Sequence, residues 1–295
     1  MLNKQEHKEE VYTFLQKRLS LYDWKFSVPH GWGKESYYAH GFKRTYFVKV
    51  GVDVERYRGM AEIGLTPPVI LHGQLDSGPT IIVQSCITGR PPSRTDYRER
   101  MGEVAGIVRK MHNSLRLKEV LPAAPSDTYK EAGLGALERL RRKWGQYKAQ
   151  VPSMAGFVDE SLEKIEKQIH QFSGEGLVAS HGDICNANWL FASDGNIYLI
   201  DFDLMQMNDP ALDLGALLWW YYAPELRKPF LEEAGYRYDE AFKYRMQVRM
   251  AMHCLDILLP RENSFDQFKP ESFDASLRDF RAVVNGQENP EGYDD

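Results

Sequence analysis

The stretch SHGDICNANWLFASDGNIYLIDFDLMQMNDPALDLG, which begins at Ser180, is rich in polar residues and contains the hydrophobic run 197–200. Charged groups beside a hydrophobic strand are costly unless something pairs with them. Asp183 and Asn188 are five residues apart, and Asp201 follows thirteen residues after Asn188, where the run IYLI ends. If the first two lie on a tight loop and Asp201 lies at a strand end, the three side chains can converge. Such hard oxygen ligands suit Mg²⁺, and the acid that is left off the metal can accept a hydroxyl proton.

The composition of the chain limits its partners. Its 295 residues are 43% hydrophobic and 27% charged, which is ordinary for a globular protein. A net charge of -5 gives no electrostatic reason to expect nucleic acid or an anionic membrane as a partner. Small molecules or other proteins are therefore favoured, and the sequence leaves open whether the chain is a monomer or a homodimer.

Cysteine usage and hydrophobic runs both favour a cytoplasmic protein. Cys86, Cys185 and Cys254 are far apart and form no CxxC pair, which fits a reducing compartment. The opening MLNKQEHKEEVYTFLQKRL lacks the apolar core of a signal peptide, and no run of about 18 apolar residues occurs. We therefore expect a protein that is neither secreted nor membrane-spanning.

The first part of the chain is predicted to be β-rich. Residues 6–21 have the apolar spacing of an amphipathic helix, and the segment 24–51 contains short β-rich runs broken by glycines. That pattern is typical of three antiparallel strands. Two more strands are predicted near 69–71 and 80–86, and a hinge near 83–89.

The pattern after Gly89 is mainly helical. Helices are predicted at 96–115, 131–150 and 158–172, and again between 211 and 258. A hairpin interrupts them, with a turn at 193–195 between the strands NWLFA and IYLID.

These elements predict an α+β fold with two lobes. Residues 1–88 form a small β-rich N-lobe, and residues 89–284 form a larger helical C-lobe that carries the hairpin. Residues 285–295, which end in NPEGYDD, are expected to be a disordered tail.

Several motifs resemble the aminoglycoside phosphotransferase and choline kinase family. HGDICNAN, LIDFD and NDPALDLGALL are similar to its HGDxxxxN signature, its hydrophobic strand ending in Asp, and its DPxxDL helix start. The Asp-to-Asn spacing is also that of protein kinases. In the first part, TYFVKVG, GLTPPVI and TIIVQSCITG resemble the lysine strand, the turn before the fourth strand, and the strand with its hinge. MGEVAGIVRKMHNS resembles the family's first large-lobe helix. The resemblance spans roughly 25–220 and implies a bilobal protein-kinase-like fold.

The resemblance implies roles for the polar residues. Asp183 is then the catalytic base or hydroxyl-orienting acid, and Asn188 and Asp201 hold Mg²⁺. Lys49 contacts the α- and β-phosphates of ATP and pairs with an acid on the following helix. Glu55 is the expected partner, with Glu62 as the alternative. The backbone of Gln84, Ser85 and Cys86 is expected to bind adenine, and the loop with Gly31 and Gly33 is expected to cover the phosphates.

Other residues of the polar stretch have more than one interpretation. Asp213 is expected to cap a helix and anchor the catalytic loop, and His181 to brace it. Asp203 either binds a second metal ion or is solvated beyond the strand. Cys185 has no triad-like partner and is expected to be a spectator. It opens the run Cys-Asn-Ala where the family often has His-Pro-Gly, a departure that bears on subfamily rather than on activity.

The function implied is an ATP- and Mg²⁺-dependent phosphotransferase acting on a hydroxyl of a small molecule. The acceptor is an aminoglycoside-like antibiotic or a metabolite such as choline or a sugar. One or two aromatic side chains of 219–222 are expected to line the acceptor pocket. The alternative is a nucleotide-binding pseudokinase with a scaffolding role, like spore-coat proteins that resemble this family.

Overall fold

The chain folds into two compact units in the computed structural model. The first runs to Arg90 and also includes Leu190–Asp203; the second contains Pro91–Trp189 and the described residues from Leu204 onward. The structure describes residues 6–19, 23–29, 34–260 and 267–295. In this division the hairpin belongs to the first unit.

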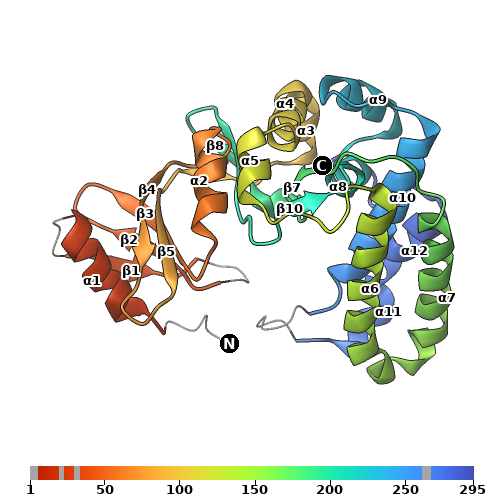
Figure 1. The fold of residues 1–295 in the computed structure, drawn as a ribbon, viewed down its shortest axis with the longest axis horizontal. Helices are drawn as coiled ribbons and strands as arrows, with labels where there is room; N and C mark the ends of the chain where they lie inside the picture. Colours follow the sequence, from red (N-terminus) through yellow and green to blue (C-terminus); the bar gives the residue numbers. More distant parts are fainter. Residues whose placement is uncertain (1–5, 20–22, 30–33, 261–266) are drawn as a thin grey trace. The chain divides into compact units, whose positions relative to one another are not determined.

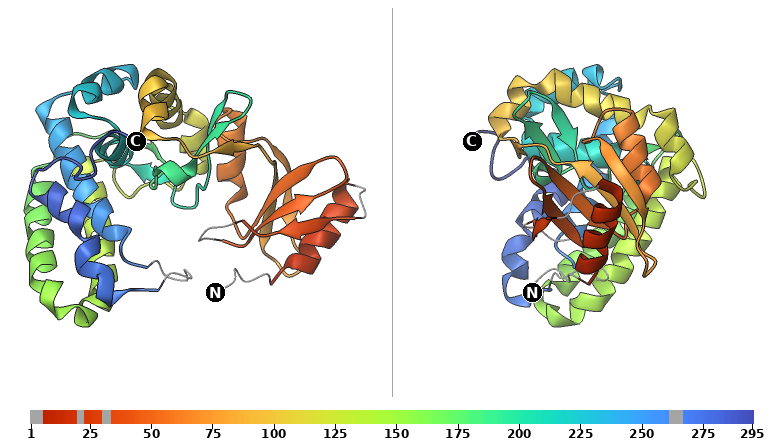
Figure 2. Two further views of the ribbon diagram at one scale, coloured as in Figure 1. Left: turned by 180° about the vertical axis from the view of Figure 1, so that it is seen from behind. Right: turned by 90° about the vertical axis from the view of Figure 1, so that its left-hand side faces the viewer.

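A five-stranded antiparallel sheet forms the centre of the first unit (Figure 1), with the strand order β1-β2-β3-β5-β4. Its strands are β1 (Lys25–Ser27), β2 (Ser36–His40), β3 (Thr45–Val50), β4 (Val69–Gln74) and β5 (Thr80–Ser85). Helix α1 (Lys8–Leu19) lies along the sheet (Figure 2), and α2 (Val54–Glu62) follows β3. These elements match the helix and the five strands predicted from the sequence.

The alternation of side chains along β3 separates the core from the site. Tyr46, Val48 and Val50 are buried in a cluster with residues of α1, including Val11 and Leu15. Because successive side chains of a strand point to opposite faces, Lys49 points to the other face. The apolar pattern of this strand therefore determines where its lysine is presented.

The hairpin groups with the first unit for identifiable reasons. Strands β8 (Trp189–Ala192) and β9 (Ile197–Leu199) pair with each other, and β8 also pairs with β6 (Gly89–Arg90). In addition, the backbone N–H of Leu199 donates to the carbonyl of Leu65 at 2.8 Å. Pairings between residues this far apart in the chain cannot be read from local hydrophobic patterns.

The second unit is mainly helical (Figure 1). Its α-helices are α3 (Arg94–Glu99), α4 (Met101–His112), α5 (Leu115–Val120), α6 (Tyr129–Tyr147), α7 (Pro152–Ile169), α8 (Ala211–Tyr221), α9 (Pro224–Glu233), α10 (Glu240–Asp256), α11 (Pro270–Ser276) and α12 (Arg278–Val284). A short ladder of β7 (Val178–Ser180) and β10 (Gln206–Asn208) lies beside them. The single helix predicted at 96–115 is divided at Arg100 and again near Asn113, and α5, α11 and α12 were not predicted from the sequence. No helix within the described residues is both long and apolar enough to cross a bilayer.

Helices α8 and α10 approach each other closely at Gly215. A Cβ atom built there lies 2.7 Å from the backbone carbonyl oxygen of Met246. We expect Gly215→Ala to lower the free energy of unfolding by about 1–3 kcal/mol, because the two helix backbones must move apart. Gly145→Ala on α6 is the matched control, since nothing lies within 4 Å of its added carbon. Urea denaturation of both variants measures the difference, and equal stabilities would contradict the prediction.

Candidate active site

A buried lysine is surrounded by oxygen atoms in the first unit. The Nζ of Lys49 lies 2.7 Å from Oδ1 of Asp201, 3.2 Å from Oδ2 of Asp203 and 2.9 Å from the hydroxyl of Tyr57. The lysine side chain is 6% exposed, whereas that of Asp201 is 37% exposed. The carboxylates therefore form the accessible edge of this cluster.

The charge of Lys49 is maintained by its neighbours. Burial alone would lower the pKa of this ammonium group, but Tyr57, Asp201 and Asp203 outweigh that effect and hold the pKa above its ordinary value. Burial also raises the pKa of Tyr57, so its hydroxyl stays protonated at neutral pH. The cluster thus contains one positive charge and two carboxylates.

The backbone around Asp201 is unusual. Asp201 has a φ of 65°, and among the described residues other than glycine it is alone in having a positive φ. Between the two aspartates, Phe202 is fully buried and packs edge-on against Tyr57, with ring centroids 5.2 Å apart. Arg56 of α2 donates to the carbonyl of Asp203 at 3.0 Å. Non-glycine residues are held in this conformation only where surrounding contacts require it, and such residues cluster at functional sites.

Helix α2 presents a tyrosine to Lys49. Glu55 and Glu62, the acids predicted from the sequence as partners of Lys49, both form ion pairs with Arg58, at 2.7 and 3.6 Å. Tyr57 is the α2 residue whose contact with the lysine is described above. Asp201 and Asp203 are the carboxylates that pair with Lys49 in this structure. The assignment of Glu55 as the partner of Lys49 stays a prediction.

The strand expected to receive adenine uses several of its polar groups inside the sheet. The backbone N–H of Ser85 donates to the carbonyl of Pro68 at 3.1 Å, and that of Cys86 donates to the carbonyl of Thr45 at 3.3 Å. The side chain of Gln84 is buried and donates to the carbonyl of Pro67. Contacts of these three residues to adenine remain a prediction. The predicted phosphate-covering residues Gly31 and Gly33 lie outside the described residues.

Residues 181–188 form the loop that is predicted to be catalytic, called the catalytic loop below, and it belongs to the second unit. Asp183 is half-buried, and its backbone carbonyl accepts a hydrogen bond from Nδ2 of Asn188 at 2.7 Å. A short 3₁₀ turn, Asn186–Asn188, joins the two. Because the amide nitrogen of Asn188 is used in this way, its oxygen is the atom that remains to bind a cation.

Asp213, near the start of α8, anchors this loop through hydrogen bonds. Its carboxylate accepts the backbone N–H groups of His181 at 2.8 Å and Gly182 at 3.0 Å, and Nε2 of His112 at 3.0 Å. Burial alone would raise the pKa of Asp213, but the hydrogen bond from His112 and the backbone donors outweigh it and keep the pKa below its ordinary value. Gly182 has a φ of 80°, and an added Cβ would lie 2.8 Å from the carbonyl oxygen of Leu204. The expected anchoring role of Asp213 agrees with these contacts, whereas the expected capping role is wrong, because Asp213 lies inside the first turn of α8 and the N-cap residue is Pro210.

Two supporting residues were not singled out from the sequence. His112, the last residue of α4, contacts Asp213 through its side chain. The motif MHNS at the end of that helix is the sequence signal that could have identified it. Asp209 accepts the N–H of Ala211 at 2.9 Å and pairs with buried Arg245 at 3.1 Å. The Asp before Pro in NDPALDLG was the signal for this cap.

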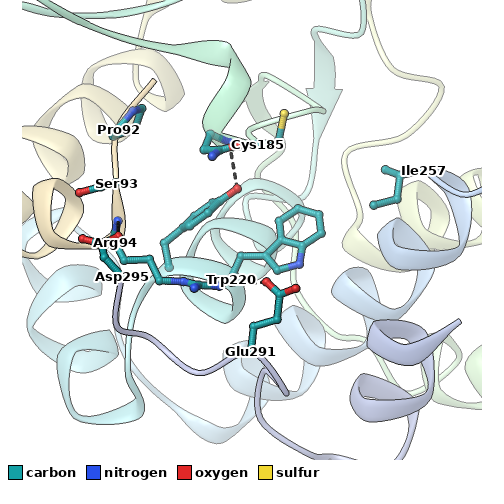
Figure 3. Close-up of a pocket in the computed structure, with 10 residues that line it drawn as sticks. Pro92, Ser93, Arg94, Cys185, Trp220, Ile257, Glu291 and Asp295 are labelled. Atoms are coloured by element: carbon teal, nitrogen blue, oxygen red, sulfur yellow. Dashed lines mark hydrogen bonds and ion pairs between the residues drawn. The ribbon is translucent and has the colours of Figure 1, made fainter. Parts of the chain in front are cut away.

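A cavity of about 490 Å³ lies next to the catalytic loop (Figure 3). The hydroxyl of Tyr221 accepts the backbone N–H of Asn186 at 2.9 Å, so one wall of the cavity is tied to the loop. Its ring stacks on Tyr97 with centroids 4.6 Å apart. The residues lining the cavity are Pro92, Ser93, Arg94, Cys185, Asn186, Trp220, Tyr221, Ile257, Glu291 and Asp295.

The predicted site residues thus form two groups. Lys49 and Asp201 are brought together in the first unit, and Asp183 and Asn188 in the second. Their oxygen donors fit Mg²⁺, which uses one or two protein carboxylates and completes its shell with phosphate oxygens and water. Among the described residues no group of three or more His, Cys, Asp or Glu side chains forms a metal cage.

Comparison with protein families gives one match over most of the chain. Residues 28–247 match the family described as the phosphotransferase enzyme family. The match includes all the predicted site residues, from Gly31 to Asp201, and ends inside α10.

Solved structures with the same fold include choline kinase LicA from Streptococcus pneumoniae. It is 18% identical, with a TM-score of 0.66, and the alignment covers 95% of this chain and 99% of that one. A choline/ethanolamine kinase family protein from Mesorhizobium loti is 17% identical, with a TM-score of 0.68 and 96% of each chain covered. Spectinomycin phosphotransferase, solved with ADP and spectinomycin, is 16% identical, with a TM-score of 0.58, covering 94% of this chain and 96% of that one. The predicted α+β protein-kinase-like fold is confirmed.

Proposed function

Because this chain belongs to the phosphotransferase enzyme family, we propose that it transfers the γ-phosphoryl group of ATP to a hydroxyl of a small molecule, with Mg²⁺ as the metal ion. The observation that carries the proposal is the cluster of Lys49 with Asp201 and Asp203, in which Asp201 has a left-handed backbone. Phosphoryl transfer depends on positioning and charge neutralisation, and a lysine, a metal site and one further acid are sufficient for it.

Lys49 and Asp201 are the proposed nucleotide-binding pair. The ammonium group of Lys49 binds the α- and β-phosphate oxygens, and its tether to Asp201 and Asp203 fixes its position before the nucleotide arrives. Asp201 and the amide oxygen of Asn188 hold the ion, which when bound supplies positive charge to the phosphate oxygens. The carboxylate of Asp183 accepts the proton of the attacking hydroxyl and directs its oxygen.

The cavity beside the catalytic loop is the proposed acceptor site. It begins two residues after Asp183, at Cys185 and Asn186. Trp220 and Tyr221 give it aromatic walls, which supports the assignment of this cavity as the acceptor site. A cavity of this size holds a metabolite or one part of an antibiotic. The similarity to choline kinase and spectinomycin phosphotransferase makes amino alcohols and aminoglycosides the first acceptors to test.

Phosphate transfer to a panel of acceptors tests the proposal. The purified protein is incubated with Mg²⁺, γ-labelled ATP and either choline, ethanolamine, spectinomycin, hygromycin B or a mixture of sugars. Mass spectrometry then detects products that have gained one phosphate. We expect at least one acceptor to be labelled by the wild type and not by Asp183→Asn. ATP binding without any labelled product would contradict the proposal and would favour a nucleotide-binding protein without catalysis.

Loss of the lysine is expected to weaken ATP binding. In Lys49→Met the charged hydrogen bonds to phosphate are absent, so the dissociation constant for ATP should rise by roughly 10- to 100-fold. The matched control is Lys43→Met, because Lys43 is exposed in the turn between β2 and β3. Isothermal titration with ATP and Mg²⁺ measures both variants. An unchanged ATP affinity in Lys49→Met would contradict the assignment of Lys49 to the nucleotide site.

A further inference from the structure

Residues of the segment 289–295 form two walls of the cavity. Glu291 and Asp295 line it together with Arg94 and Trp220 (Figure 3). The family match ends at residue 247, so these two walls are formed by a segment outside the matched region. The shape of the cavity therefore depends on a part of the chain that is not described by the family pattern.

The segment begins at a firmly held residue. Asn289 is 6% exposed, and its side-chain amide donates to the carbonyl of Trp220 at 3.2 Å. Its side-chain oxygen accepts the N–H of Glu291 at 3.0 Å. Two residues earlier, the carbonyl of Gln287 accepts a hydrogen bond from the indole of Trp219. The chain is thus fixed to α8 up to Asn289.

Most contacts beyond Asn289 are charged and exposed, although the hydroxyl of the partly buried Tyr293 also accepts a hydrogen bond from Arg227 of α9 at 2.7 Å. Glu291 pairs with Arg278 at 2.7 Å and with Arg94 at 3.1 Å, and Asp294 pairs with Arg98 at 3.3 Å. The side chain of Glu291 is 52% exposed and that of Asp294 is 94% exposed.

The final contact is made to the start of α3. The carboxylate of Asp295 accepts the backbone N–H groups of Arg94 at 2.7 Å and Thr95 at 2.9 Å. Hydrogen bonds from Thr95 hold the pKa of Asp295 below its ordinary value. The segment therefore reaches from α8 to α3 across one side of the cavity.

We infer that residues 289–295 form a strap that closes one side of the acceptor cavity and opens as a unit about Asn289. Exposed ion pairs are individually weak and are screened by salt, whereas the Asn289 anchor is buried and uncharged. The strap is therefore the part of this wall that detaches most readily.

Closure of the strap also determines the charge of the cavity. With the strap in place, Glu291 neutralises the guanidinium group of Arg94. When the strap leaves, Arg94 faces the cavity without that partner, and the space beside Trp220 widens. The closed form thus admits neutral or cationic acceptors and excludes bulky ones. This consequence rests on the proposed function, whereas the movement itself does not.

The thiol of Cys185 reports the movement without any substrate. Cys185 lines the cavity, and burial raises the pKa of its thiol to about 11. Cys86 belongs to the first unit and serves as an internal reference, while buried Cys254 should stay unreactive in every folded sample. N-ethylmaleimide labelling is followed for each cysteine by peptide mass spectrometry.

Two variants release the strap. One is the triple variant Glu291→Gln, Asp294→Asn, Asp295→Asn, and the other ends after Asn289. Because several weak pairs are removed together, we expect the labelling rate of Cys185 relative to Cys86 to rise by roughly tenfold in both. Raising the salt from about 0.05 M to about 1 M should have a similar effect on the wild type and little effect on the triple variant.

Glu240→Gln is the matched control, because it removes an exposed ion pair to Lys243 outside the cavity lining. Relative labelling that stays at the wild-type value in both strap variants, with Cys254 still protected, would overturn the inference. No nucleotide or acceptor is present, so the result is independent of turnover. If the strap opens but the protein phosphorylates no acceptor, the proposed function is rejected and the inference about the strap stands.

Discussion

Replacing Asp183 by Asn is expected to lower kcat by roughly 10²- to 10⁴-fold, the usual contribution of a positioned general base. The amide has nearly the same shape as the carboxylate but cannot accept the hydroxyl proton. The hydrogen bond between Asn188 and this residue uses the backbone carbonyl of Asp183, so it survives the substitution. The loop should therefore keep its geometry, whereas residue 183 can no longer act as the general base.

The measurement compares kcat with the affinity for ATP in the same protein. Asp183→Asn should bind ATP and Mg²⁺ with close to the wild-type affinity, because Lys49 and Asp201 are unchanged. Asp194→Asn is the control, since Asp194 lies in the exposed turn between β8 and β9 and accepts only a local hydrogen bond from Asn196. A kcat within about threefold of the wild type in Asp183→Asn would exclude this residue as the base.

Replacing Asp213 by Ala is expected to lower the free energy of unfolding by about 3–5 kcal/mol, as the loss of one member of a buried polar network does. Three donors would lose their acceptor inside the protein: the N–H groups of His181 and Gly182 and Nε2 of His112. Buried donors without partners cost the full price of their desolvation. The catalytic loop should be the first region to lose its structure.

Urea denaturation measures this loss, and Asp256→Asn is the control. Asp256 pairs with Lys143 at 2.9 Å, but its side chain is 41% exposed. Removal of an exposed pair should cost less than about 1 kcal/mol. Similar losses in the two variants would contradict the anchoring role of Asp213.

The dependence on pH follows from the same carboxylate. The pKa of Asp213 is lower in the folded protein than in the unfolded chain, where it is near 3.8. Such a group contributes stability above the unfolded pKa, and this contribution is lost as the pH falls through the folded pKa. The stability gap between the wild type and Asp213→Asn should therefore be constant above a pH of about 5 and should shrink below about 4. A gap that widened at low pH would contradict the assigned direction of the shift.

The sequence predicts much of this molecule because its signals are local. The spacing of Asp183 and Asn188 is set by a short loop, and the position of Lys49 follows from the alternation within a single strand. The five strands, the hairpin and most long helices also follow from patterns within a few turns or residues. The family resemblance rests on these same local motifs.

What the sequence does not reveal depends on distant parts of the chain. The contact of Tyr57 with Lys49 depends on how α2 is rotated against the sheet, which no local pattern of the sequence specifies. The grouping of the hairpin with the first unit requires contacts to Leu65 and to β6. The composition of residues 285–295 is typical of disorder, while their contacts lie on α3, about 200 residues earlier.

The way in which Asp213 holds the catalytic loop has a consequence for how this scaffold changes during evolution. Two of its three hydrogen bonds go to backbone N–H groups, and every residue except proline has such a group whatever its side chain. The frame that positions Asp183 is therefore nearly independent of the side chains at Cys185, Asn186 and Ala187. Under the proposed function, substitutions at these positions would change the shape of the acceptor cavity while Asp183 stays in place, which is one physical route by which such a scaffold acquires new substrates.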